Sequence, residues 1–198
     1  GAQSRHHISR NGTLDPTFVD FSGSLVYFDS LENLEITPDG KILAVGSIFI
    51  GSSPTNYGVV RFNPDGSLDT SFTPVTFMSD TPKVVRVLPN GQIVVGGNFS
   101  GLNTATRPGI ARLNANGSVD SSYLPSLSSQ NFSPSVTEII VQSSGKVLVA
   151  GNFDQVGGIN RKSFALLNSD GTLDVAFNPT FTGIIHVLEQ LQNGNILV

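Results

Sequence analysis

NPDGSLDTSF, residues 63–72, is one copy of a string that returns through the whole chain. Its core is a turn glycine, Ser or Thr, Leu or Val, Asp, two variable residues and an aromatic residue. Successive turn glycines are 54, 51 and 54 residues apart, and a fixed period of this size indicates a repeat architecture. The copies are NGTLDPTF (11–18), DGSLDTSF (65–72), NGSVDSSY (116–123) and DGTLDVAF (170–177), with turn glycines Gly12, Gly66, Gly117 and Gly171.

Two further strings share this period, so chance does not explain the pattern. One of them, out of phase with the first, consists of a Gly-containing turn followed by an apolar run: PDGKILAVG (38–46), PNGQIVVGG (89–97), SSGKVLVAG (143–151) and QNGNILV (192–198). The other directly precedes the opening string: GVVRFN (58–63), GIARLN (109–114), SFALLN (163–168) and a degraded RHHIS (5–9).

Each string predicts a local structure. The apolar runs are rich in β-branched residues, which favours strands that are buried on both faces. The Pro-Asp-Gly and Pro-Asn-Gly turns suit tight hairpins, because proline presets the first turn position and glycine accepts a positive φ. No segment has a 3.6-residue apolar period between helix caps. Each period therefore predicts four short antiparallel strands, the size of one propeller blade.

We therefore predict an all-β fold, a β-propeller built from four blade repeats of about 50 residues with four strands each. The whole chain, 1–198, forms one domain in this interpretation, with blades at 19–72, 73–123 and 124–177. Residues 1–18 and 178–198 would together complete a split fourth blade. Two arrangements remain open: a four-bladed ring closed by both termini, and an excerpt of a larger propeller.

The composition excludes several classes of function. Charged residues make up 13% of the chain, about half the usual share, and the formal net charge is −4. Without a basic cluster, the chain lacks the electrostatic footprint of a nucleic-acid-binding protein. No apolar run is long enough to predict insertion into a membrane. The absence of cysteine excludes disulfides and thiolate metal sites, and the many small polar residues favour an extracellular location.

The combined pattern PDGKILAVG…F…GVVRFNPDGSLDTSF, over residues 38–72, resembles the delta-60 repeat family of bacterial β-propeller proteins. The resemblance covers nearly the whole chain, although GSIF (46–49) departs from the GGNF (96–99) and GNF (151–153) of the later copies. It implies a secreted or surface-attached repeat protein that forms one segment of a longer polypeptide. It implies no catalytic residues.

An aspartate follows each turn glycine by three residues: Asp15, Asp69, Asp120 and Asp174. One hypothesis makes these residues calcium ligands, but a calcium loop of the EF-hand type needs more carboxylates than the turns contain. The alternative is a structural carboxylate that accepts backbone N–H bonds and holds the hairpin in place. Recurrence in every copy favours the structural role, so we expect no cofactor and no metal. The aromatic residues that end each copy, Phe18, Phe72, Tyr123 and Phe177, are likewise expected to pack between blades.

The best candidates for ligand contacts lie in the loops at 46–57, 96–108 and 151–162. Asn98 and Arg107 flank one loop, and Asn152 and Arg161 flank the next at the same nine-residue spacing, while copy two has Ile48 and Tyr57 at these positions. Polar loops on one face of a rigid scaffold are common sites of recognition. The alternative is that each arginine donates to carbonyls of its own loop.

Histidines and glutamates give weaker signals. His6 and His7 are adjacent on a predicted strand and would point to opposite faces, so they do not share a metal ion readily; His186 is the third histidine. Glu35 and Glu189 occupy matching positions on first strands, where the other copies have Arg86 and Ile140. Two carboxylates that face a central channel would suit a glycoside-processing enzyme.

We therefore expect a non-catalytic, secreted or cell-surface module that binds a glycan or a protein partner through its loops. It would belong to a longer polypeptide. The alternatives are a purely structural spacer of a larger surface protein and a glycoside-processing enzyme that uses channel carboxylates.

Overall fold

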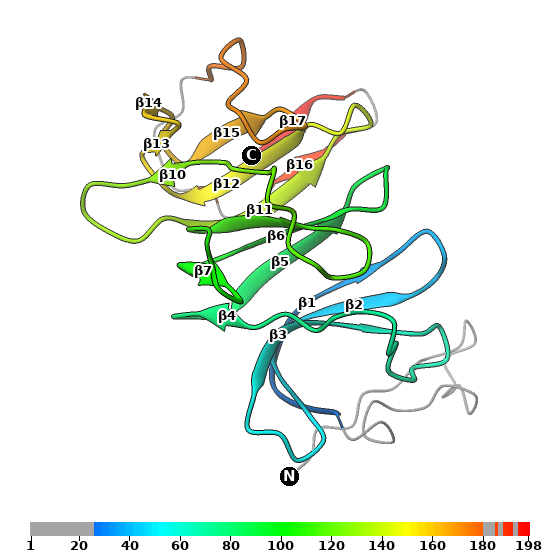
Figure 1. Cartoon of the computed structure of the whole chain (residues 1–198). Coiled ribbons are helices and arrows are strands. Elements are labelled where there is room, and N and C mark those ends of the chain that lie inside the picture. Colours follow the sequence, from blue (N-terminus) through cyan, green and yellow to red (C-terminus); the bar gives the residue numbers. More distant parts are fainter. Residues whose placement is uncertain (1–25, 180–184, 186–187, 192–193) are drawn as a thin grey trace.

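The computed structural model describes residues 26–179, 185, 188–191 and 194–198, and every regular element among them is a β-strand (Figure 1). Three antiparallel sheets of three strands, each in the order first–second–third, form the body of the molecule. They are β1 (Val26–Ile36), β2 (Ile42–Ile50) and β3 (Asn56–Phe62); β5 (Pro82–Val87), β6 (Ile93–Gly97) and β9 (Ile110–Leu113); and β11 (Ser135–Val141), β12 (Val147–Asn152) and β15 (Phe164–Leu167).

Smaller strands complete the described part of the fold. Two short three-stranded sheets lie at the loop end of the second and third blades, and a two-stranded hairpin represents the fourth repeat. They comprise β4 (Phe77–Met78), β7 (Gly101–Leu102) and β8 (Ala105–Thr106); β10 (Leu127–Ser128), β13 (Gln155–Val156) and β14 (Ile159–Asn160); and β16 (Glu189–Gln190) and β17 (Ile196–Leu197). The all-β propeller predicted from the repeats is confirmed.

The fourth strand of each blade is much shorter than expected. In its place, an isolated β-bridge joins the end of the third strand to the residue two positions after the turn glycine: Phe62 with Leu68, Leu113 with Val119, and Leu167 with Leu173. In the first blade, Val59 of the third strand also forms a bridge with Val75. The cause lies in the next residue, because Asp69 accepts a hydrogen bond from the backbone N–H of Ser71. Such a side-chain turn bends the chain away from the ladder directly after the bridge.

The hairpin turns form as predicted. Gly40 has φ +81° and donates its N–H to the Thr37 carbonyl at 2.8 Å, while the Thr37 N–H bonds the Lys41 carbonyl at 2.9 Å. The corresponding turns of the other repeats have the same bonds, including that of residues 191–195. The described end of the chain therefore repeats the hairpin of the complete blades.

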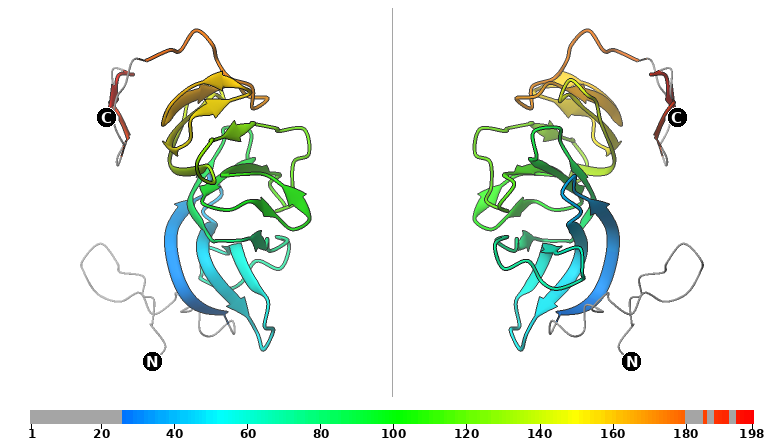
Figure 2. Two further views of the ribbon diagram at one scale, coloured as in Figure 1. Left: turned by 90° about the vertical axis from the view of Figure 1, so that its left-hand side faces the viewer. Right: turned by 90° about the vertical axis from the view of Figure 1, so that its right-hand side faces the viewer.

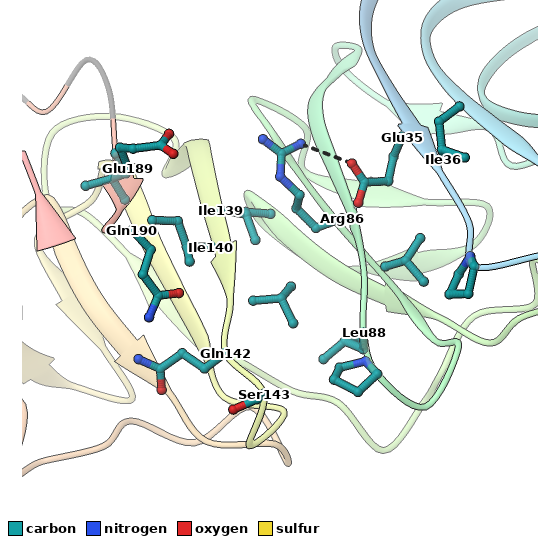
Figure 3. Close-up of a pocket in the computed structure, with 15 residues that line it drawn as sticks. Glu35, Ile36, Arg86, Leu88, Ile139, Ile140, Gln142, Ser143, Glu189 and Gln190 are labelled. Carbon is teal, nitrogen blue, oxygen red and sulfur yellow. Dashed lines mark ion pairs between the residues drawn. The ribbon is translucent and has the colours of Figure 1, made fainter. Parts of the chain in front are cut away.

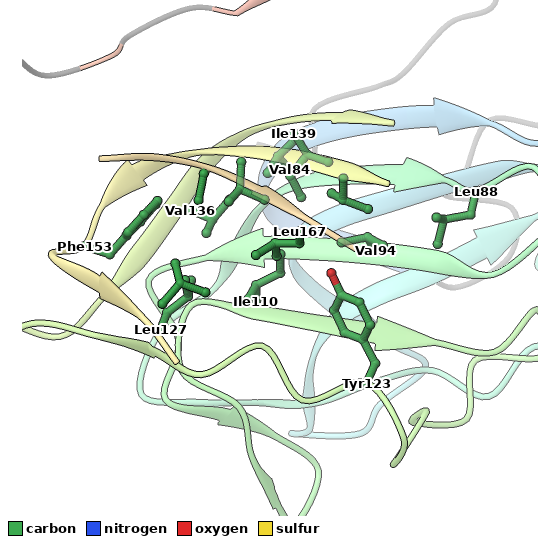
Figure 4. Close-up of a cluster of buried hydrophobic side chains, with 14 residues drawn as sticks. Val84, Leu88, Val94, Ile110, Tyr123, Leu127, Val136, Ile139, Phe153 and Leu167 are labelled. Carbon is green, nitrogen blue, oxygen red and sulfur yellow. The ribbon is translucent and has the colours of Figure 1, made fainter. Parts of the chain in front are cut away.

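Neighbouring blades pack face to face, and alternate residues of one strand serve different interfaces. Val85 and Val95 pack toward the first blade, whereas Val84 and Val94 pack toward the third (Figure 4). Strands buried on both faces, as the β-branched runs predicted, result from this arrangement. Beyond the third blade, Leu148 and Leu166 form a cluster with Ile185, Leu188 and their neighbours.

The sheets follow one another in chain order, and β16 and β17 turn back toward the side on which β1 lies (Figure 2). The predicted contribution of residues 1–18 to the split blade lies outside the described residues, together with Asp15, Gly12, His6, His7 and His186. An excerpt of a larger propeller fits the described structure. In the described part of the chain, we find no helix that is long and apolar enough to cross a membrane.

Candidate functional site

The three recurrent aspartates that the structure describes lie within the blade scaffold. The carboxylate of Asp69 accepts bonds from Lys41 Nζ and Arg61 Nε, both at 2.7 Å, and from the N–H and hydroxyl of Ser71. Asp120 has the same arrangement, with Gln92 Nε2 at 2.8 Å in place of the lysine. Cations and N–H groups thus surround these carboxylates. This geometry supports the structural interpretation and leaves no converging set of oxygens for calcium.

Two arginines extend this arrangement into the next blade, a contact that the sequence interpretation missed. Arg61 lies over the Phe72 ring at 4.8 Å and donates to the carbonyl of Ala115 at 2.6 Å. Arg112 lies over the Tyr123 ring at 4.4 Å and donates to the carbonyl of Ser169. We call these two contacts the arginine latch. The signal was present in GVVRFN and GIARLN, where arginine recurs at one position, and Leu166 replaces it in the next copy.

The surroundings of the aspartates lower their pKa values. Burial opposes ionisation of Asp120, but hydrogen bonds from Ser122 and Arg112 outweigh it and lower its pKa to about 2. Burial likewise opposes ionisation of Asp69, whose bonds to Lys41, Ser71 and Arg61 hold the pKa far below its ordinary value. The hydrogen bond from Lys146 lowers the pKa of Asp174. The folded structure therefore favours the ionised form of these carboxylates.

The two loop arginines bond mainly within their own loops. Arg107 donates from Nη1 to the adjacent Thr106 carbonyl at 2.8 Å, and Arg161 donates from Nη1 to the adjacent Asn160 carbonyl at the same distance. Arg161 also bonds the Val175 carbonyl, and its Nε is buried without a partner. Their geometry therefore fits the alternative in which each arginine donates to carbonyls of its own loop. A ligand contact from either arginine stays a prediction.

The two loop asparagines, in contrast, line one groove. Asn98 follows β6 and Asn152 ends β12, so equivalent positions of adjacent blades meet at the loop end of the interface between them. The cavity measures about 540 Å³, within the range of small-molecule sites. We call it the loop groove; Lys83, Gly97, Asn98, Phe132, Ser133, Ser135, Thr137 and Asn152 line it.

The two asparagines differ in their partners. Asn98 donates from Nδ2 to the Asp80 carboxylate at 3.2 Å. The Asn152 side chain is exposed and makes no hydrogen bond to the residues that the structure describes. Its complete amide is therefore available to a ligand.

Phe132 forms an aromatic wall of the groove, and its side chain is 40% exposed. Seven residues separate Ser128 from Val136, whereas three separate the equivalent Met78 from Pro82 in the preceding blade. Phe132 belongs to this insertion. Sequence reasoning did not select it, although the longer segment between the repeated strings was a visible signal.

Tyr57 lies elsewhere. The segment expected as the loop 46–57 is largely strand, because β2 and β3 continue as a hairpin with Ile48 paired to Tyr57. The tyrosine is half-buried and packs against the apolar cluster of its own blade around Ile48 and Val60. It does not join Asn98 and Asn152 in the groove.

A second cavity, the central pocket, lies where the first strands of all four repeats meet (Figure 3). Residues of β1, β5, β11 and β16 line its volume of about 540 Å³. Glu35 and Glu189 both reach this pocket, as the channel hypothesis required, from opposite sides in Figure 3. Glu35 lies 3.9 Å from Arg86 Nη1, and this nitrogen also bonds Asn33 and the Val85 carbonyl.

Near this pocket, burial raises the pKa of Glu138, and the charge of Arg86 opposes the shift. Glu138 does not line the cavity. Among the residues that the structure describes, no three acidic, histidine or cysteine side chains form a group that could hold a metal ion.

A comparison with protein-family models identifies the repeats. The model described as the domain of unknown function (DUF5122) beta-propeller matches residues 37–72, 88–123 and 142–177, together more than half of the chain. The chain belongs to the DUF5122 β-propeller family. The expected propeller repeat family is thereby confirmed, and the delta-60 name stays a prediction.

Among solved structures, a similar one is PorZ from Porphyromonas gingivalis, whose report describes an essential bacterial surface component of the type-IX secretion system. The identity is 15% and the TM-score 0.48. The match covers 88% of this chain and 27% of PorZ, so the chain spans about a quarter of that protein's length. A search of curated proteins found no match.

Segments of this DUF5122 propeller that the family model matches differ in content from the segments that it does not match. The matched stretches contain the hairpin turns of the three complete blades, Asp69, Asp120, Asp174 and the arginine latch. The segments between them, 73–87 and 124–141, contain Phe132 and most of the inner-strand residues of the central pocket. The repeated scaffold therefore lies within the family pattern, and much of both cavity walls lies outside it.

Proposed function

We propose that this DUF5122 propeller is a non-catalytic recognition module, secreted or held at a bacterial cell surface within a longer polypeptide. Its ligand, a glycan or a protein, binds at the loop groove. The observation that carries the proposal is the meeting of Asn98 and Asn152 from adjacent blades beside the exposed Phe132. Ligand sites commonly combine an apolar wall with a few polar groups on a rigid scaffold.

The two other hypotheses make different predictions. A structural spacer requires no ligand and no groove-dependent binding. A glycoside-processing enzyme requires Glu35 and Glu189 of the central pocket to act as a pair. The pairing of Glu35 with Arg86 supports a structural role for that carboxylate. An activity that disappears in both Glu35→Gln and Glu189→Gln, with the fold intact, would favour the enzyme over our proposal.

The test uses the absence of cysteine from the chain. A single cysteine replaces Asn152 in one variant and Ser144 in its matched control, at opposite ends of β12, and each is labelled with a polyethylene glycol maleimide. We expect the unlabelled chain to bind envelope preparations of the producing bacterium saturably. The label at position 152 should abolish this binding, and the label at position 144 should leave it unchanged.

Other outcomes would contradict the proposal. No saturable binding would favour the structural spacer. Binding that persists with the label at position 152, or disappears with the label at position 144, would place recognition outside the loop groove.

A further inference from the structure

The loop groove holds the chemical groups that recognise an uncharged sugar, and we propose that its ligand is a neutral saccharide. This inference rests on the recognition role proposed above and specifies the class of ligand at the same groove. Three features of the groove support it: the available hydrogen-bonding groups, the exposed ring and the charge balance.

The polar groups of the groove match hydroxyl groups. The Asn152 amide offers both a donor and an acceptor, and the amide oxygen of Asn98 stays available while its nitrogen donates to Asp80. Ser133, Ser135 and Thr137 add hydroxyls on the same lining. A sugar hydroxyl donates one hydrogen bond and accepts others, so paired amide and hydroxyl groups satisfy it well.

Phe132 supplies the apolar part of the site. Its side chain is 40% exposed on an inserted segment, whereas Phe99 and Phe153, which follow the second strands of these two blades, are fully buried. An exposed aromatic face can cover the C–H face of a pyranose ring and remove both surfaces from water. Amide groups beside an exposed aromatic ring are therefore the pattern expected of a saccharide site. The repeated aromatic residues, in contrast, were predicted to pack in the core.

The charge balance favours a neutral ligand. Lys83 is the charged side chain of the lining, and its Nζ lies 3.1 Å from the Glu32 carboxylate. An acidic sugar would have to compete with Glu32 for this ammonium group. An uncharged sugar can bind while the ion pair stays intact.

The groove is less suited to a protein partner. Protein interfaces of standard size bury about 800 Å² on each partner and concentrate their binding energy in Trp, Tyr and Arg. Among the described residues, one exposed aromatic side chain and no arginine line the groove. Its volume of about 540 Å³ instead suits a short oligosaccharide.

The experiment measures binding of the full chain to immobilised neutral and acidic oligosaccharides, and compares Phe132→Ala and Asn152→Ala with a control. The control, Leu124→Ala, removes another exposed apolar side chain (59% exposed) that does not line the groove. We expect binding to a neutral class, weakened about tenfold or more by each groove variant and unchanged by the control, since tenfold corresponds to about 1.4 kcal/mol. Thermal melting of each variant confirms that it is folded.

A second arm separates the ligand class from the recognition role. Periodate cleaves vicinal diols of sugars, so treatment of the bacterial envelope should abolish binding of the unmodified chain even where the immobilised sugars do not include the right one. Envelope binding that survives periodate but is blocked by the label at position 152 would overturn the saccharide and leave recognition standing. Oligosaccharide binding that neither groove variant weakens, or that is confined to acidic sugars, would also overturn it. Absence of any envelope binding would instead overturn the recognition role.

Discussion

At the scale of single residues, Ser163 stands in a backbone conformation that favours glycine. Its φ is +62°, and the equivalent residue of the preceding blade is Gly109, with φ +74°. The bonds around both are the same, because each accepts from a glycine N–H of the second strand and donates to the carbonyl of a phenylalanine. Side chains other than glycine pay roughly 1–2 kcal/mol for this conformation.

We predict that Ser163→Gly raises the free energy of unfolding by about 1 kcal/mol or less, because glycine's freedom in the unfolded chain offsets part of the gain. The matched change Gly109→Ser should lower it, since a Cβ there would lie 2.9 Å from the Pro134 carbonyl oxygen. Urea denaturation of both variants measures the effect. A less stable Ser163→Gly protein would contradict the account.

Tyr123 shows a second local departure from the repeat. It is fully buried where other copies have Phe72 and Phe177, and its hydroxyl has no hydrogen-bond partner among the residues that the structure describes. Burial raises the pKa of this hydroxyl, so it stays protonated. An unsatisfied buried polar group costs roughly 1–3 kcal/mol.

Tyr123→Phe is therefore expected to increase stability by about 1 kcal/mol. The reciprocal change Phe72→Tyr, in the preceding repeat, should decrease it. Thermal and urea melts of the two variants provide the measurement. A loss of stability in Tyr123→Phe would show that the hydroxyl forms a stabilising hydrogen bond and would contradict the prediction.

At the scale of the blade, the bonds of Asp120 make stability depend on pH. Because folding lowers the pKa of this carboxyl to about 2, its ionised form stabilises the folded state above its ordinary pKa near 3.8. Protonation then removes that contribution as the pH falls from about 4 toward 2. Asp69 has the same sign, through its bonds to Lys41 and Arg61.

We predict that Asp120→Asn is less stable than the natural chain at pH 7 and that the difference shrinks as the pH falls from 4 to 2. The measurement is the melting temperature of both proteins across that range. Asp65→Asn is the comparison, since hydrogen bonds from Ser67 also lower the pKa of this exposed carboxylate but no lysine or arginine contributes. Its pH dependence should have the same sign and lack the contribution of a charged partner. A difference for Asp120→Asn that does not change with pH would exclude the proposed role of its charge.

Much of the blade could be predicted from the sequence, because turn glycines and β-branched runs determine local structure with few alternatives. The fourth strand could not, since a hydrogen bond from the Ser71 N–H to the Asp69 carboxylate decides where the ladder ends. The arginine latch also depends on contacts between residues more than fifty positions apart. Such contacts follow from blade packing and leave only a recurring arginine in the sequence.

At the scale of the whole molecule, the repeats bring equivalent loop positions together. Asn98 and Asn152 were predictable as a pair because they recur at one position of the pattern. Phe132 was not, because it lies in the stretch between the repeated strings, which has no common pattern among the copies. The candidate site thus combines a repeated part and a unique part. The unique part distinguishes this groove from the interface between the first and second blades.

Nuclear magnetic resonance of the isotope-labelled full chain, titrated with polysaccharide extracted from the bacterial envelope, tests the central claim most directly. We predict amide shift changes at residues 97–98, 129–135 and 152, and little change at the opposite turns 89–92 and 143–146. Changes confined to those turns, or to the central pocket around Arg86 and Ile140, would contradict recognition at the loop groove. A spectrum that does not change would contradict the saccharide as its ligand.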